Sequence, residues 1–212
     1  MHDLHNGLQH IIVICSTRPG RINPVVSQFV WDQIAQQRVV QDNAVQVELL
    51  DVASQHLPLY DEPVVPSRCP ADDPTAHYAH AHTRAWSARV RQFDAFIFVT
   101  PQYNWSVPAA LKNALDYLFH EWSGKPAGIV SYGHRGGGKA ADHLRQILAG
   151  LRMGPVVEPA VALKLLKGAP DDKVDDSTIN LWLEAGEAHH IQAVFEQLLH
   201  LLPSTPGGGH RA

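Results

Sequence analysis

The chain has 212 residues, a length that fits one α/β domain better than two. Hydrophobic residues make up 45% of it and charged residues 18%, which is the composition of a soluble globular protein and not of a disordered one. The 17 basic and 21 acidic residues leave a net charge of −4 without a basic block, so the sequence indicates neither nucleic acid nor a membrane as a partner.

Cysteine and histidine give little sign of a metal site. The two cysteines, Cys15 and Cys69, are too few for a disulfide framework or a four-cysteine site. His77, His80 and His82 are close together but lack Cys or acidic ligands in register, so they predict a polar helix face and no bound metal. Because the start lacks the segments of a signal peptide and no apolar run reaches roughly 18 residues, we expect a cytoplasmic protein.

The first part of the chain predicts a flexible leader at residues 1–9 and then a strand, a loop and a helix. Residues 11–15 are an apolar run typical of a buried strand, and residues 25–34 have helical periodicity. Between them the loop reads S-T-R-P-G-R-I-N-P. A helix amino terminus offers unpaired N–H groups and partial positive charge, so this loop predicts an anion site, although it matches neither G-x-G-x-x-G nor a Walker loop.

The next part predicts a strand, a long loop and a helix. Residues 45–50 alternate between apolar and polar side chains, which indicates the second strand. Residues 58–74 are rich in proline and aspartate and predict a mobile lid. Residues 75–93 predict a helix with only a weak apolar stripe.

The central unit of the sequence is D-A-F-I-F-V-T-P-Q-Y-N-W-S-V-P-A-A-L-K-N-A-L-D-Y-L-F, residues 94–119. Residues 95–99 predict a strand that is buried on both faces, and Pro101 ends it because proline has no N–H for a sheet ladder. After the polar loop 102–106, Pro108 suits the first turn of a helix with apolar residues at 3.6-residue spacing. The loop thus lies at the carboxyl end of a strand, where open α/β sheets bind ligands.

The last part predicts a fourth strand at residues 127–131, a helix at 140–151 and a fifth strand from residues 156–157 and 160–163. A final helix at 177–202, with Ser177 as its N-cap, and a disordered tail at 203–212 complete the prediction. The loop G-H-R-G-G-G-K-A at 133–140 matches a Walker A loop at seven positions. However, Ala140 replaces the Ser or Thr that binds Mg²⁺, and no Walker B strand follows. ATP is therefore kept as an alternative ligand of this loop.

Strand and helix alternate five times. This predicts one domain over residues 10–202, with a five-stranded parallel sheet of order 2-1-3-4-5 in a three-layer sandwich. The loops after the first, third and fourth strands would then meet at one edge of the sheet.

Three loops also resemble those of a known family. P-Q-Y-N-W-S-V-P-A-A-L-K-N-A-L-D is similar to the signature P-E-Y-N-x-S-x-P-x-x-L-K-N-A-L-D of the NAD(P)H-dependent FMN reductases, which have a flavodoxin-like fold. S-T-R-P-G-R resembles their phosphate loop, and S-Y-G-H-R-G-G resembles their segment S-x-G-x-x-G-G. The resemblance covers roughly residues 10–155.

The resemblance implies an FMN-dependent NAD(P)H oxidoreductase with a ping-pong mechanism. NADPH or NADH would pass a hydride to FMN and leave, and a quinone, azo compound, free flavin or similar acceptor would take its place. Because FMN carries the chemistry, no catalytic residue of the protein is assigned. The residues implied at the FMN phosphate are Ser16, Arg18, Asn23, Pro24 and Val25, with Arg21 as a possible helper, and those implied at the ring are Pro101, Gln102, Tyr103, Asn104, Trp105, Ser131, Tyr132, Gly133 and Gly136.

The resemblance also implies a homodimer or homotetramer, with the apolar helix after Pro108 as the expected interface and the lid on the substrate side. The chain departs from the family at Cys15, where Gly is usual, and at Gln102, where Glu is usual. Arg68 or Arg84, near the lid, is a candidate to recognise a 2′-phosphate. Two alternatives are a flavodoxin-type electron carrier and a partner-binding protein that has lost the cofactor.

Overall fold

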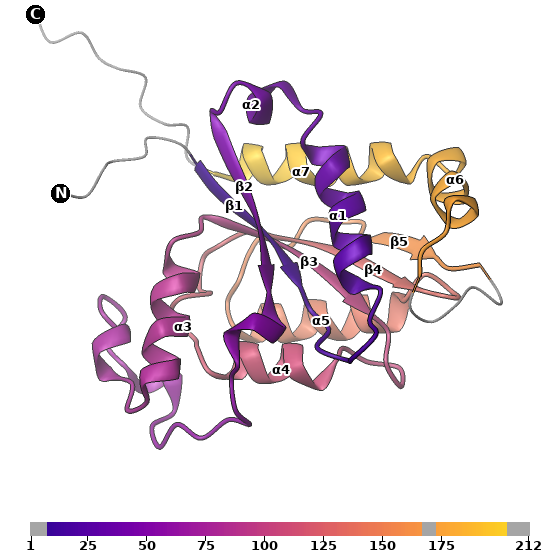
Figure 1. Cartoon of the computed structure of the whole chain (residues 1–212). Helices are drawn as coiled ribbons and strands as arrows, with labels where there is room; N and C mark the ends of the chain where they lie inside the picture. Colours follow the sequence, from indigo (N-terminus) through magenta and orange to yellow (C-terminus); the bar gives the residue numbers. More distant parts are fainter. Residues whose placement is uncertain (1–7, 167–172, 203–212) are drawn as a thin grey trace, which may run out of the picture.

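The computed structural model describes residues 8–166 and 173–202, and its centre is a five-stranded sheet of order β2-β1-β3-β4-β5 (Figure 1). All neighbouring strands are parallel; Ile12, for example, pairs with Leu49 on one side and Ile97 on the other. The predicted sheet and its order are confirmed. The strands are β1 (Leu8–Ile14), β2 (Val45–Asp51), β3 (Ala95–Pro101), β4 (Ala127–Gly133) and β5 (Val161–Lys164).

Helices cover both faces of the sheet, which gives the predicted three layers (Figure 1). One face carries α1 (Asn23–Ile34) and α7 (Glu187–Leu201). The other face carries α3 (Ala81–Arg91), α4 (Ala109–Asp116) and α5 (Gly138–Gly150). Two smaller helices, α2 (Arg38–Gln41) and α6 (Asp176–Glu184), lie at the periphery (Figure 1).

Successive residues of the inner strands enter two separate cores. Ile11 packs with the α3–α5 layer, whereas Ile12 packs with the α1 and α7 layer. Every residue of β3 is buried. A strand that is covered on both faces gains from apolar side chains at every position, and this explains the unbroken apolar runs in the sequence.

The helix predicted at residues 75–93 is shorter in the structure. Thr75–His77 forms a separate 3₁₀ turn, and α3 begins at Ala81. The buried carboxylate of Glu62 accepts hydrogen bonds from the N–H groups of Ala79 and His80, both at 2.9 Å. A carboxylate at this position satisfies amides just before the helix, so a residue distant in sequence sets where α3 starts.

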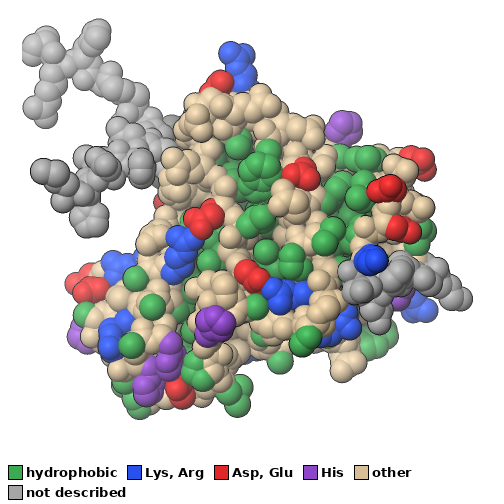
Figure 2. All heavy atoms as spheres, in the orientation of Figure 1, with side chains coloured by type: hydrophobic (Ala, Val, Ile, Leu, Met, Phe, Trp, Pro, Cys, Tyr) green, Lys and Arg blue, Asp and Glu red, His purple; other side chains and the backbone are tan. Residues whose placement is uncertain are grey.

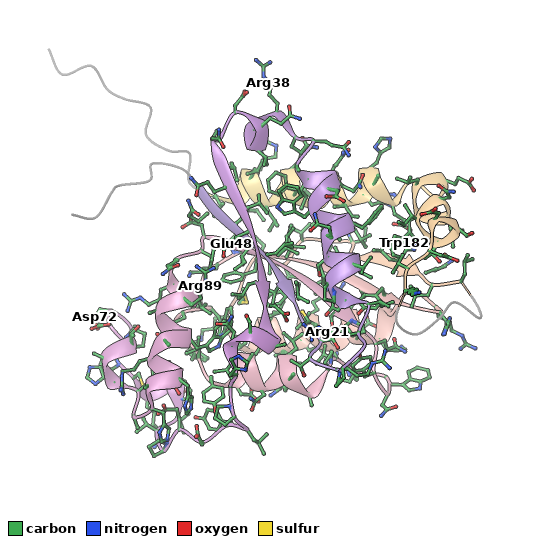
Figure 3. All side chains as sticks on the ribbon, viewed as in Figure 1. Arg21, Arg38, Glu48, Asp72, Arg89 and Trp182 are labelled. Atoms are coloured by element: carbon green, nitrogen blue, oxygen red, sulfur yellow. The ribbon has the colours of Figure 1, made fainter. Side chains whose placement is uncertain are left out.

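The long C-terminal helix predicted at residues 177–202 is two helices. Gly186 has a φ of 77° and separates α6 from α7. The N-cap of α6 is Asp175 and not the predicted Ser177, because Asp175 Oδ1 accepts the Thr178 N–H at 2.9 Å. Trp182 fixes α6 to β5 by donating its indole N–H to Lys164 O at 2.7 Å (Figure 3).

The fifth strand and the helix after Pro108 also differ from expectation. Of the segment predicted as β5, only residues from Val161 join the strand, whereas Val156 makes an isolated bridge to Ala127. The helix α4 ends at Asp116, so the later part of the predicted apolar stripe lies in turns. The stripe residues Leu111, Leu115, Leu118 and Trp122 are at most 1% exposed because they pack in the chain's own core, whereas Phe119 is partly exposed. The expected interface at this helix stays a prediction.

The structure describes most of the predicted domain. β1 begins at Leu8, two residues inside the expected leader, and residues 1–7 and 203–212 lie outside the described residues. None of the described helices is long and apolar enough to cross a membrane.

The histidines before and within α3 lie on the surface, where purple side chains gather over that lobe in Figure 2. His80 and His82 stack with their ring centroids 5.1 Å apart, and His82 Nε2 lies 3.0 Å from Asp61 Oδ1. Within residues 8–166 and 173–202, no three His, Cys, Asp or Glu side chains are placed to hold a metal ion.

Candidate functional site

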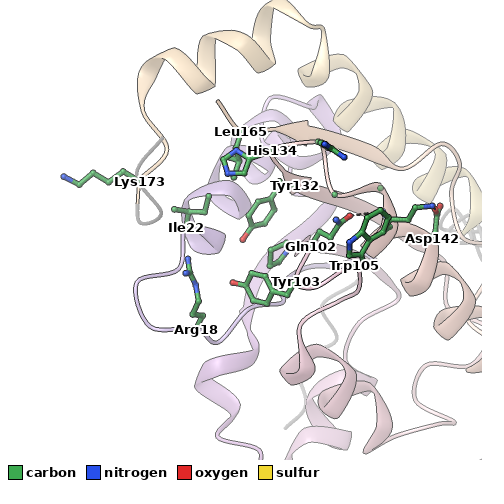
Figure 4. Close-up of a pocket in the computed structure, with 16 residues that line it drawn as sticks. Arg18, Ile22, Gln102, Tyr103, Trp105, Tyr132, His134, Asp142, Leu165 and Lys173 are labelled. Atoms are coloured by element: carbon green, nitrogen blue, oxygen red, sulfur yellow. Dashed lines mark hydrogen bonds and ion pairs between the residues drawn. The ribbon is translucent and has the colours of Figure 1, made fainter. Parts of the chain in front are cut away.

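A pocket of about 770 Å³ opens at the carboxyl ends of β1, β3 and β4 (Figure 4). The volume is within the range of roughly 300–1,000 Å³ that is usual for small-molecule sites. The chain leaves β1 toward one face of the sheet and β3 toward the other, so a crevice opens between their loops. The lining residues are Arg18, Ile22, Pro101, Gln102, Tyr103, Trp105, Tyr132, Gly133, His134, Arg135, Gly137, Gly138, Lys139, Asp142, Leu165 and Lys173.

The loop after β1 is fixed by hydrogen bonds inside the protein. Asn23 Oδ1 accepts the Ser16 N–H at 2.6 Å, and Asn23 Nδ2 donates to Val99 O at 3.0 Å. Ser16 Oγ and Tyr103 Oη are 2.8 Å apart. Ser16 and Asn23 are both fully buried. Both atoms of the Asn23 amide are used in these contacts, so Asn23 shapes the loop and does not line the pocket.

The two arginines of this loop have different roles. Arg21 forms an ion pair with Asp51, whose other oxygen, Oδ1, accepts the Ala53 N–H at 3.0 Å. Arg18 lines the pocket, with its guanidinium 6.0 Å from the centre of the Tyr103 ring. Of the two, Arg18 is therefore the cation that faces the pocket (Figure 4).

The loop after β3 contains a tight turn from Tyr103 to Ser106. Each of these two residues donates its N–H to the carbonyl of the other, at 2.9 and 3.0 Å. The central residues Asn104 and Trp105 have φ angles of 46° and 69°, the pattern of a type I′ turn. Asn tolerates the left-handed region, whereas a bulky residue such as Trp rarely adopts it.

The loops after β3 and β4 are joined across the pocket. Gln102 Oε1 accepts the Lys139 N–H at 3.0 Å, and Ser106 Oγ lies 3.1 Å from His143 Nδ1. Lys139 and His143 belong to α5, so the start of this helix holds the loop after β3 at both of its ends. Gln102, which stands where the family usually has Glu, thus satisfies a backbone amide at the start of α5.

Glycines allow the loop after β4 to bend back against the strand. Ser131 Oγ donates to Gly136 O at 2.7 Å, and Gly136 and Gly137 have φ angles of 79° and 77°. A Cβ at Gly137 would lie 2.8 Å from both the N and the O atom of Tyr132, so only glycine fits there. Burial raises the pKa of Tyr132 well above its usual value, so its phenol stays protonated in the pocket wall.

The structure brings the three predicted loops together. Among the predicted site residues, Arg18, Pro101, Gln102, Tyr103, Trp105, Tyr132 and Gly133 line the pocket. The others lie within three residues of a lining residue in the chain and do not themselves line the pocket; they are Ser16, Asn23, Pro24, Val25, Asn104, Ser131 and Gly136.

Sequence reasoning missed several lining residues. The glycine-rich run pointed to the neighbourhood of Gly137, Gly138 and Lys139, but nothing in the sequence places Asp142 or Leu165 beside it. The missed residues are Ile22, His134, Arg135, Gly137, Gly138, Lys139, Asp142, Leu165 and Lys173.

The expected lid lies elsewhere. The described residues 58–74 do not line the pocket, and the start of this segment is held to α4 instead. Asn113 accepts the Tyr60 N–H at 2.8 Å and donates to Pro58 O at 2.7 Å. Arg84 donates to the carbonyls of Tyr78 and Ala79 and also lies outside the pocket lining.

The fold and the pocket define a class: open parallel α/β proteins that bind a ligand at the switch point of a flavodoxin-type sheet. A family model described as NADPH-dependent FMN reductase matches residues 9–166. The chain is 39% identical over 174 residues to an NAD(P)H-dependent FMN reductase of Saccharomyces cerevisiae, covering 80% of this chain and 88% of that protein.

A second relative and a solved structure are also similar to the chain. The quinone reductase of Escherichia coli strain K12 is 31% identical over 190 residues, which is 87% of this chain and 89% of that protein. The structure of FerB from Paracoccus denitrificans, a flavoenzyme NAD(P)H:(acceptor) oxidoreductase, has a TM-score of 0.61 over 90% of this chain and 98% of that chain, at 22% identity. The chain belongs to the NADPH-dependent FMN reductase family of oxidoreductases, and the predicted flavodoxin-like fold and family are confirmed.

Proposed function

We propose that the protein is an FMN-dependent NAD(P)H oxidoreductase that reduces a small-molecule acceptor such as a quinone, an azo compound or a free flavin. The observation that carries this proposal is the meeting of three loops at one pocket, with Arg18 at one end and the glycine-rich start of α5 at the other (Figure 4). Family membership supports the same activity.

The residues of the pocket fit FMN. Arg18 and the amino terminus of α1 suit the phosphate, since both favour negative charge. The bare backbone at Gly137 suits the edge of a planar ring, because a Cβ there would meet the Tyr132 backbone. Gln102 and Tyr103 complete the wall between the two ends. Ser16 and Asn23 would act indirectly, by holding the phosphate loop in shape.

Bound FMN supplies hydride chemistry, taking up a hydride from NAD(P)H and passing it to the acceptor. The protein contributes fixed N–H groups at the start of α5 that favour negative charge in the pocket. A ping-pong order, in which NAD(P)H and the acceptor occupy the same place in turn, needs only this one pocket. Hydride transfer in this order, to any of the proposed acceptors, requires no acid or base from the protein. The phenols of Tyr103 and Tyr132 are therefore assigned to the pocket wall.

A flavodoxin-type electron carrier is the second candidate function. Carriers dock on large partners through strongly acidic surfaces, whereas the net charge here is −4 and the pocket lining holds several cations, Arg18, Arg135, Lys139 and Lys173, against one acid, Asp142. This charge pattern favours small anionic reactants over a basic protein partner.

Steady-state turnover separates the two functions. The protein loaded with FMN is mixed with NADPH and a soluble quinone, and NADPH oxidation is followed by absorbance. Sustained oxidation that depends on both FMN and quinone supports the reductase. Bound FMN that NADPH does not reduce within minutes would favour the carrier instead.

A further inference from the structure

Trp105 is an exposed aromatic residue in a strained turn. Its φ of 69° lies in the left-handed region, which a bulky residue rarely adopts, yet the side chain is 63% exposed and gains little from burial. Because it also lines the pocket, its ring extends the pocket wall toward solvent (Figure 4). Strain without compensating burial is typical of residues that a ligand contacts.

The structure holds this turn firmly. The paired backbone hydrogen bonds between Tyr103 and Ser106 close it, and the contact of Ser106 with His143 ties it to α5. Gln102, the residue before the turn, is fixed to the same helix because its side chain accepts the Lys139 N–H. Trp105 is thus carried on a preformed platform, which lowers the conformational entropy lost when a ligand stacks on it.

One cation, Lys139, lies beside this platform, and a second, Arg135, lines the same pocket. Lys139 Nζ is 6.0 Å from the centre of the Trp105 ring, and its nearest carboxylate oxygen, on Asp142, is 3.9 Å away. Asp142 also pairs with Arg145, so Lys139 is only partly neutralised. Arg135 is exposed on the pocket rim and forms no ion pair within the described part of the chain.

This positive end of the pocket is separate from the phosphate end. In Figure 4, Arg18 and Trp105 lie on opposite sides, with Tyr103 and Gln102 between them. An FMN phosphate that is bound at Arg18 would therefore leave Lys139 and Arg135 available to a second anion. Lys139 and Arg135 make the pocket rim positive although the whole protein has a net charge of −4, so the rim attracts negatively charged ligands.

We propose that Trp105, Lys139 and Arg135 form a subsite for an aromatic ring that carries an anionic group. The ring stacks on Trp105 and the anion pairs with the two cations. Two ligands have this chemistry: the adenine with its 2′-phosphate in NADPH, and an acceptor such as a sulfonated or carboxylated naphthoquinone. The inference rests on the proposed function and names the reactants that its pocket selects.

The test is binding at equilibrium, without turnover. Each protein preparation is first titrated with FMN, so a failure to bind FMN is recorded separately from a failure of the subsite. The FMN-loaded protein is then titrated calorimetrically with adenosine 2′-monophosphate and with naphthalene-2-sulfonate, each compared with its uncharged partner, adenosine and 2-naphthol. Should FMN not bind, the same probes are used on Arg18→Ala protein, in which the phosphate loop no longer competes for anions.

The variants isolate the two interactions. Lys139→Ala should weaken binding of the anionic probe roughly three- to tenfold and leave its uncharged partner unchanged, and Lys139→Arg should restore it. Trp105→Ala should weaken the charged and uncharged probes alike, on the order of tenfold, and Trp105→Phe should lose less. Arg38→Ala, which removes an exposed cation far from the pocket (Figure 3), should change nothing.

The two sources of the ligand give different outcomes. Tight binding of adenosine 2′-monophosphate, with a preference for NADPH over NADH that Lys139→Ala removes, supports the nucleotide as occupant. Tight binding of the sulfonate alone, with the same dependence on Lys139, supports an acidic acceptor. Probe binding that neither Lys139→Ala nor Trp105→Ala changes would overturn the subsite, even in protein that binds FMN normally.

Discussion

Two adjacent glycines at the start of α5 give a matched test of the loop after β4. Gly137 has a φ of 77°, and a Cβ there would lie 2.8 Å from the N and O atoms of Tyr132. Gly138 is the first residue of the helix, and a Cβ there would have no neighbouring atom within 4 Å. The same Gly→Ala change therefore produces a steric overlap at Gly137 and none at Gly138.

The magnitudes follow from the geometry. At Gly137, alanine costs about 1–2 kcal/mol for the left-handed backbone and about 1–3 kcal/mol for the overlap with the Tyr132 backbone. The reduced entropy of the unfolded chain returns about 0.4–1 kcal/mol. We expect Gly137→Ala to lower the free energy of unfolding by about 2–4 kcal/mol, and Gly138→Ala to raise it by up to about 1 kcal/mol.

Thermal and urea unfolding measure both variants, each with and without added FMN. For a chain of this size, Gly137→Ala should lower the melting temperature by about 4–16 °C. If the loop relaxes locally instead, stability will fall less, but FMN affinity should fall with it, because this backbone forms the pocket wall. A Gly137→Ala protein that keeps both the stability and the FMN affinity of the unchanged protein would refute the assignment of this loop.

Three other variants test separate parts of the structure. Arg18→Ala should weaken FMN binding about ten- to a hundredfold in a fluorescence titration, whereas Arg38→Ala should leave it unchanged. Trp105→Gly should keep or raise the melting temperature, since glycine relieves the positive φ, and a marked loss would show a structural role for the indole. Burial lowers the pKa of His10 from 6.5 to about 4, against the opposing effect of Asp94, so the unfolded chain binds a proton that the folded chain does not. Stability should therefore be lost as pH falls from about 6.5 to about 4, by up to about 3 kcal/mol, and an equally steep acid-unfolding profile in His10→Leu would contradict this origin.

The sequence predicted the sheet because alternating strands and helices admit few arrangements. Apolar runs located β1, β3 and β4, and an alternating pattern located β2. Helix ends were harder to predict. Gly186 stands inside a helical pattern, where glycine is usually tolerated, and only its positive φ shows that the chain turns there. The start of α3 depends on Glu62, which periodicity within the helix does not reveal.

The candidate site shows the same limit. Loop motifs located the pocket, because residues at the carboxyl ends of neighbouring strands must meet. The motifs did not separate lining residues from those that shape the loops. Both polar atoms of the Asn23 amide form hydrogen bonds inside the protein, and Arg21 is paired with Asp51. Such contacts join residues that are distant in sequence. Lys139 was missed for a similar reason, since only the folded chain places its side chain beside Trp105.

The most direct test of the proposed function is an FMN titration of the purified protein under anaerobic conditions, followed by addition of NADPH. We predict that one FMN binds per chain at micromolar concentration or below, and that NADPH bleaches the visible flavin absorbance within the mixing time of the experiment. Protein that shows no FMN binding at micromolar concentration would contradict the account, because the pocket between Arg18 and Gly137 would then have another ligand.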